Sequence, residues 1–205
     1  MKNKFLIMVL VVLMLSLVGS IGFANENVEE NQEELFGFGE EIPDYSAYAG
    51  ISYDMLLELS QYNDNNGFGV YAGGRKWIND DVAIGIEGEF ITANSEFNHS
   101  DFPTEGVNIF SVGGLATYEV SKGIYAIGGI APYFATFDDG EETYTENTIG
   151  LKIGAEANFA LTEELNTVAR AIYRGAEVDL DVGNAKFSDI DIGGAQLAIG
   201  ITRGF

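Results

Sequence analysis

The feature that most constrains the fold is a two-residue period in hydrophobicity, which recurs in eight segments from residue 45 onward. A period of two is typical of β-strands, whose successive side chains point to opposite faces. Most of these segments hold ten to sixteen residues, whereas strands of soluble domains usually have about five or six. A tilted strand that crosses a bilayer needs about 9–11 residues, so the lengths favour a membrane barrel. The segments are 45–60, 67–77, 82–93, 107–120, 124–137, 147–161, 165–178 and 189–205.

The two faces of these segments differ in chemistry. In 147–161, one parity carries Ile149, Leu151 and Ile153, while the other carries Lys152 and Glu156. Membrane barrels are apolar outside and polar inside, and an eight-stranded barrel is just wide enough for side chains to fill it. Charges buried there must be paired, because an uncompensated one costs several kcal/mol. The pattern therefore predicts an interior salt-bridge network of Asp54, Glu58, Glu87, Glu89, Lys152, Glu156, Arg170 and Arg174.

The connections between the segments alternate in length. Tight connections at 79–81, 121–123 and 162–164 alternate with longer or more polar ones at 61–67, 94–106, 138–146 and 181–188. Outer-membrane barrels have short turns at one end, longer loops at the other and an even number of strands. The sequence thus predicts an all-β fold, an eight-stranded antiparallel up-and-down transmembrane β-barrel.

Two further observations concern the aromatic residues and the fifth segment. Segment 124–137 is apolar on both parities and contains Pro132, which is unfavourable in a central strand because it cannot donate a ladder hydrogen bond. Aromatic residues lie near the predicted strand ends, as in the two girdles of a membrane barrel. These residues are Trp77, Tyr118, Tyr125, Phe137, Phe159, Tyr173 and Phe205.

The N-terminal residues have the pattern of a secretory signal. Lys2 and Lys4 precede an apolar run over 5–18, and small residues follow before residue 25. We expect three parts: a signal peptide at 1–24, an acidic disordered leader at 25–44, and the barrel at 45–205. Export together with a membrane barrel indicates the outer membrane of a diderm bacterium.

The last segment carries a resemblance to a known family. Leu197, Ile199, Ile201 and Phe205 share one parity, and the chain resembles the small eight-stranded outer-membrane β-barrel family that includes the membrane domain of outer membrane protein A. In that family the final strand alternates apolar residues and ends in phenylalanine, which the barrel-assembly machinery reads as an insertion signal. The resemblance implies that these four residues form such a signal. Arg203 departs from the pattern, since an apolar or aromatic residue is usual there.

No catalytic or metal-binding motif is found in the sequence. His99, Ser100 and Asp101 are adjacent, and the side chains of neighbours on an extended chain diverge, so they do not predict a hydrolytic triad. With no cysteine, no P-loop and a net charge of −22, the chain is expected to be no enzyme, to hold no cofactor or specific metal site, and to bind no nucleic acid. The acidic stretch 138–143 leaves weak divalent cation binding as an alternative to solvated loop charge.

The leading functional hypothesis is a structural or surface-interaction role in the outer membrane. Outer-membrane lipid, the barrel-assembly machinery and an unidentified partner of the loops are the expected contacts, and the barrel is expected to be a monomer. One alternative is a narrow pore for small solutes, lined by the interior charges. Another is a soluble periplasmic carrier of lipocalin type, in which Lys152 and Glu156 would point outward instead of inward.

Overall fold

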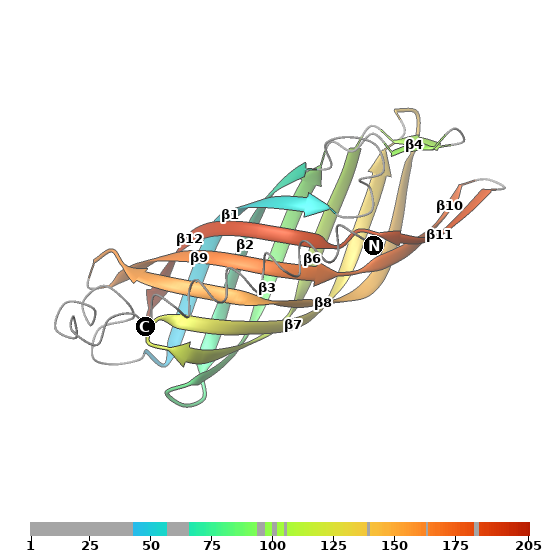
Figure 1. The fold of residues 1–205 in the computed structure, drawn as a ribbon. Helices are drawn as coiled ribbons and strands as arrows, with labels where there is room; N and C mark the ends of the chain where they lie inside the picture. Colours follow the sequence, from blue (N-terminus) through green and yellow to red (C-terminus); the bar gives the residue numbers. More distant parts are fainter. Residues whose placement is uncertain are drawn as a thin grey trace.

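The computed structural model describes residues 43–56, 66–93, 97–99, 102–104, 106–138, 140–162, 164–182 and 185–205. Eight long antiparallel strands close into a barrel in the order β1-β12-β9-β8-β7-β6-β3-β2 (Figure 1). Two short two-stranded sheets, β4-β5 and β10-β11, are separate from the sheet of the barrel. No helix in these ranges has the length and hydropathy needed to cross a membrane. The strands are β1 (Tyr45–Leu56), β2 (Asn66–Trp77), β3 (Val82–Ala93), β4 (Phe97–His99), β5 (Phe102–Thr104), β6 (Gly106–Ser121), β7 (Ile124–Asp138), β8 (Thr143–Ala160), β9 (Leu165–Gly175), β10 (Glu177–Val182), β11 (Ala185–Asp191) and β12 (Gly194–Gly204).

The barrel closes where its first strand pairs with its last. Strands β1 and β12 run antiparallel from the pair Ser46–Gly204 to the pair Leu56–Gly194. Beyond that ladder, the Phe205 N–H donates to the Tyr45 carbonyl at 2.8 Å and the Tyr45 N–H donates to the Phe205 carbonyl at 3.3 Å. Closure leaves no sheet edge among these eight strands, which is the condition a β-structure must meet inside a bilayer. The predicted fold class is confirmed.

The two ends of the barrel differ in their connections, and we call them the turn end and the loop end. At the turn end, the Asn79 side chain accepts from the N–H groups of Asp81 and Val82, at 3.0 and 2.8 Å. The Thr162 hydroxyl does the same for the N–H group of Leu165, at 3.1 Å. Between β6 and β7, Gly123 has a φ of 72°, which only glycine adopts at little cost. These residues form the tight turns that the sequence predicts.

The loop end contains two short hairpins that the sequence does not predict. The long connection 94–106 contains the short hairpin β4-β5, and the connection predicted at 181–188 lies in the hairpin β10-β11 (Figure 1). The predicted seventh segment, 165–178, was therefore too long, since β9 ends at Gly175. Ala176 separates β9 from β10, and Ile192 and Gly193 separate β11 from β12. A Cβ at Gly193 would sit 2.4 Å from the Arg174 carbonyl oxygen, so only glycine allows this approach.

Pro132 lies within β7, a strand with neighbours on both sides. Its pairing with Ile149 on β8 is regular, whereas the pairing of β6 with β7 is interrupted between Ser111–Tyr133 and Gly114–Ile130. The missing N–H of the proline faces that gap. The strand thus accommodates proline by forgoing local pairing with β6.

The outer surface of the barrel is apolar. Large hydrophobic side chains are exposed on seven of the eight strands, whereas the outward face of β9 carries three small residues between the half-buried Leu165 and Tyr173. The prediction of aromatic girdles was wrong for three residues, because their parity turns them inward. These three, buried inside the barrel, are Trp77, Tyr125 and Phe137.

Candidate functional site: the interior of the barrel

The interior of the barrel consists of three layers of side chains stacked between its two ends. The turn-end layer contains Trp77, Ala83 and Tyr125, with the rings of Trp77 and Tyr125 5.7 Å apart. The charge layer follows in the middle, and an apolar layer fills the loop end. Each layer has a different chemistry.

The charge layer contains eight ionisable side chains that alternate in sign along a continuous chain of contacts. All of them are buried, and four acids balance four bases, so the layer is formally neutral. In order of contact they are Arg75, Glu156, Arg170, Glu87, Lys152, Glu89, Arg174 and Asp54. They come from five strands, β1, β2, β3, β8 and β9, so the contacts connect opposite walls of the barrel.

The tightest part of this chain centres on Glu156. Its carboxylate accepts two hydrogen bonds from Arg75 Nη2, at 2.8 and 2.9 Å, and one from Arg170 Nε at 2.8 Å. Arg170 also donates to Glu87 at 2.6 Å. Guanidinium groups suit this role because they are planar, permanently charged donors to carboxylates. One buried carboxylate is thereby shared by two arginines.

The other half of the chain centres on Glu89. Lys152 Nζ lies 3.1 Å from Glu87 and 2.9 Å from Glu89, and so joins the two halves. Arg174 lies 3.4 Å from Asp54 and 3.5 Å from Glu89. The Gln196 amide donates to both of these carboxylates. The neutral Gln196 side chain therefore supplies further hydrogen bonds to the two carboxylates whose ion pairs with Arg174 are long.

Two tyrosine rings flank the guanidinium groups. Arg170 lies over both rings, 4.3 Å from the Tyr48 centroid and 4.5 Å from that of Tyr71, and Arg75 lies 4.6 Å from Tyr48. These distances are within the range of cation–π attraction. Glycines on the same face make room for the rings: a Cβ at Gly50 would lie 2.5 Å from the Tyr71 hydroxyl. Inward glycines thus permit large side chains in a narrow barrel.

The apolar layer closes the loop end, and the hairpin β10-β11 takes part in it. Val178, Leu180 and Ile190 from the hairpin are buried against inward residues of the barrel wall such as Tyr133 and Phe137. The apolar character of segment 124–137 on both parities has its reason here, because its inward residues face this layer. The layer comprises Leu56, Ile91, Ala93, Val107, Ile109, Ala131, Tyr133, Ala135, Phe137, Ala176, Val178, Leu180, Ile190 and Ile192.

Seven of the eight residues predicted for the interior network lie in the charge layer, and Glu58 lies outside the described residues. Sequence reasoning missed Arg75, which it had placed in a strand without assigning a face. Its parity with Tyr71 and Trp77 was the available signal, but the glycine pair at 73–74 weakened it. Gln196, which shares the inward parity of β12, was missed as well.

The four residues predicted for the C-terminal signal all face outward on β12 or just after it. Arg203 forms an exposed pair with Glu164, 2.6 Å from Nη2 to the carboxylate, and lies 5.5 Å from the Phe205 ring. An exposed pair of this kind contributes little to stability. The Arg203 side chain lies at the turn end of β12 and is 52% exposed.

Within the described ranges, no group of three or more His, Asp or Glu side chains is arranged to hold a metal ion. His99 belongs to β4, whereas Ser100 and Asp101 lie outside the described residues.

Solved structures of small outer-membrane barrels have the same fold. Neisserial surface protein A aligns with a TM-score of 0.56 at 16% identity, over 79% of this chain and 97% of its own. Ail, the attachment invasion locus protein of Yersinia pestis, in complex with the heparin analogue sucrose octasulfate, aligns with a TM-score of 0.50 at 18% identity, over 80% and 100%. The outer membrane protein OprG from Pseudomonas aeruginosa aligns with a TM-score of 0.50 at 12% identity, over 82% and 99%.

No protein-family model and no curated protein matches the chain. The identities of 12–18% make the likeness one of fold. The chain therefore has the fold of the small eight-stranded outer-membrane β-barrels, as the sequence predicts.

Proposed function

We propose that this chain is an outer-membrane protein whose barrel is closed to solutes and whose role is structural or one of surface interaction. The observation that carries the proposal is the filled interior: three layers of buried side chains lie between the two ends. A conducting barrel needs a continuous path of water. Here the buried charges contact one another instead. The turn-end layer and the apolar layer fill the barrel on either side of them.

The orientation of the two parities disfavours a soluble carrier. Lys152 and Glu156 would face solvent in a lipocalin-like barrel, but both are buried in the interior, while Ile149, Leu151 and Ile153 are exposed. Exposed apolar side chains around a closed barrel are suited to lipid. Insertion would place the turn end in the periplasm and the loop end outside the cell, with Leu197, Ile199, Ile201 and Phe205 presented to the barrel-assembly machinery.

A surface role would belong to the loop end. The hairpin β10-β11 is anchored by its apolar residues and exposes Asp181 and Asp189, so it presents an acidic surface to a partner outside the cell. The hairpin would be a rigid element of recognition because its inner face is fixed to the barrel. We propose no catalytic activity, no cofactor and a monomeric barrel.

The test is conductance across planar lipid bilayers. Purified folded protein is expected to give no current steps above those of the empty bilayer. A variant in which a short turn replaces the hairpin β10-β11 is also expected to give no current steps, because the charge layer and the turn-end layer remain. Steady conductance of the unmodified protein would overturn the closed interior and favour the narrow pore.

A further inference from the structure

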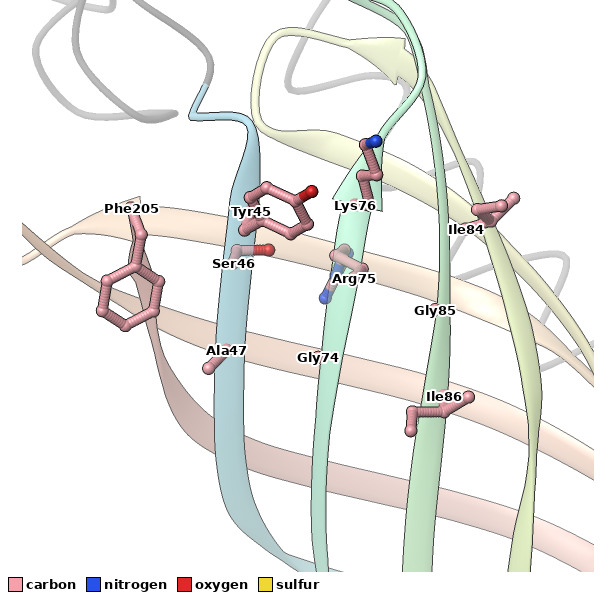
Figure 2. A pocket seen from close by; sticks show the side chains of 10 residues that line it. All are labelled: Tyr45, Ser46, Ala47, Gly74, Arg75, Lys76, Ile84, Gly85, Ile86 and Phe205. Carbon is pink, nitrogen blue, oxygen red and sulfur yellow. The ribbon is translucent and has the colours of Figure 1, made fainter.

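A groove of about 510 Å³ lies on the outside of the barrel at the turn end, across β1, β2 and β3 (Figure 2). Outward side chains of all three strands line it, and so does Phe205 just after β12. Between them, the main chain of Ser46, Gly74, Arg75 and Gly85 completes the lining. The outward side chains are Tyr45, Ala47, Lys76, Ile84, Ile86 and Phe205.

The groove exists because its floor lacks large side chains. Ala47 pairs with Gly74 across β1 and β2, and a Cβ at Gly74 would meet nothing closer than the Ser46 carbonyl oxygen at 3.6 Å. Ile84 and Ile86 stand on one side of this floor, with Phe205 on the other (Figure 2). The result is an apolar trough on the outer surface of the barrel.

One cation lines the trough, and acidic residues of the same end of the barrel adjoin it in the chain. Lys76 lies at the turn end with its Nζ 5.5 Å from the centroid of the Tyr45 ring. The exposed Asp80 and Asp81 lie in the turn that follows β2, and the main chain of Asp44 bonds to Trp77 at 3.0 Å. A cation that lines the apolar trough, followed along the chain by the carboxylates of the turn, is complementary to a phosphate followed by an ammonium group.

We propose that this groove binds one phospholipid of the bilayer leaflet at the turn end. One acyl chain would lie over Ala47 and Gly74, the phosphate would contact Lys76, and a headgroup ammonium would contact the carboxylates of the turn. The inference rests on the proposed membrane location, since only an inserted barrel presents this face to lipid. Lys76 and Tyr45 stand where basic and aromatic side chains meet headgroups at a membrane interface.

The experiment measures lipid retention by native mass spectrometry of the full chain folded in detergent micelles. The probes are dioleoyl phosphatidylethanolamine, phosphatidylcholine and phosphatidylglycerol, each added at the same concentration. One retained molecule of phosphatidylethanolamine is expected, with weaker retention of phosphatidylcholine, whose quaternary ammonium has no N–H to donate. Phosphatidylglycerol has no ammonium, so equal or stronger retention of it would overturn the assignment of the carboxylates.

Matched variants test the location. Gly74→Leu fills the trough and is expected to abolish retention, whereas Gly114→Leu is the control, because that outward glycine also has open space around it but lies outside the groove. Lys76→Gln is expected to weaken binding about fivefold, the usual contribution of one basic side chain near a membrane surface. Lys122→Gln, in another turn at the same end, is its control. Undiminished retention by Gly74→Leu would overturn the site.

Failure of the inference can be told apart from failure of the proposed function. Each sample is also run on a denaturing gel with and without boiling. A protein that shifts on boiling but retains no lipid is a folded membrane barrel without this site. A protein that shows no shift in any detergent contradicts membrane insertion itself.

Discussion

Replacing Glu156 with glutamine should destabilise the barrel more than any other single loss of a negative charge. The Glu156 carboxylate is 1% exposed and is shared by Arg75 and Arg170. Glu156→Gln keeps the volume and one acceptor oxygen, so no cavity forms, but it leaves one uncompensated positive charge in the charge layer. Removing one partner of a buried ion pair costs about 3–5 kcal/mol. With two guanidinium groups affected, we expect the upper part of that range.

The assay is equilibrium unfolding in urea, in lipid vesicles, followed by the mobility difference between folded and unfolded protein on a gel. For a slope of about 2 kcal/mol per molar urea, the midpoint should fall by about 2 M. The matched control is Glu164→Gln, which breaks a pair of similar length with Arg203 whose side chains are 52% and 70% exposed. That substitution should cost no more than about 1 kcal/mol.

A double substitution separates charge from packing. Arg75→Met combined with Glu156→Gln removes one charge of each sign, so it should cost less than Glu156→Gln alone. Equal effects of Glu156→Gln and Glu164→Gln would refute the reasoning, since burial would then make no difference. The reasoning would also be refuted if the double variant lost more unfolding free energy than its two single variants lose together.

Three further substitutions test other parts of the structure. Gly50→Ala places a Cβ 2.3 Å from the Ile199 carbonyl and should lower stability by about 1–3 kcal/mol, whereas Gly128→Ala, in open space, should not; thermal unfolding compares them. Leu180→Ala should expose the hairpin β10-β11 to limited proteolysis without changing the mobility shift of the barrel, because the lost packing is local. Ile153→Lys, at a side chain 67% exposed in the middle of β8, should cost about 2–4 kcal/mol in vesicles; an unchanged unfolding midpoint would argue against a lipid-facing surface.

The sequence predicted the strands well because one face of each carries a consistent chemistry. Along β8, Ile149, Leu151 and Ile153 alternate with Lys152 and Glu156, so the register could slip by one residue only by exchanging the two faces. The same logic located seven of the charge-layer residues. Tight turns were also predictable, since Asn79 and Gly123 have the local hydrogen bonding or the backbone freedom that such turns need.

What the sequence did not reveal depends on contacts between distant segments. A period of two separates the faces of a strand but does not say which part of the interior is apolar. The apolar residues on both parities of segment 124–137 therefore had no explanation in the sequence. In the structure, the inward Tyr133 and Phe137 pack against the hairpin β10-β11. Arg75 next to Lys76 offered two charges to one inward position. The parity shared with Tyr71 and Trp77 favours Arg75 only weakly, and the contact with Glu156, on a strand far away in the sequence, settles the choice.

The groove was also hidden from sequence reasoning. Ala47 and Gly74 are unremarkable small residues in two separate strands, and they become the floor of one trough only through the pairing of β1 with β2. The backbone conformation does not require glycine at position 74 either, so nothing in the turn chemistry of the sequence marks this residue. The absence of a side chain at that position is what matters.

The central claim, a closed barrel inserted in the outer membrane, is tested most directly by fractionating the cell envelope and running the protein on a denaturing gel, unboiled and boiled. A closed ring of main-chain hydrogen bonds resists cold detergent, so the account predicts a band in the outer-membrane fraction that moves to a different position after boiling. A single band that stays at one position in the soluble periplasmic fraction would contradict the account.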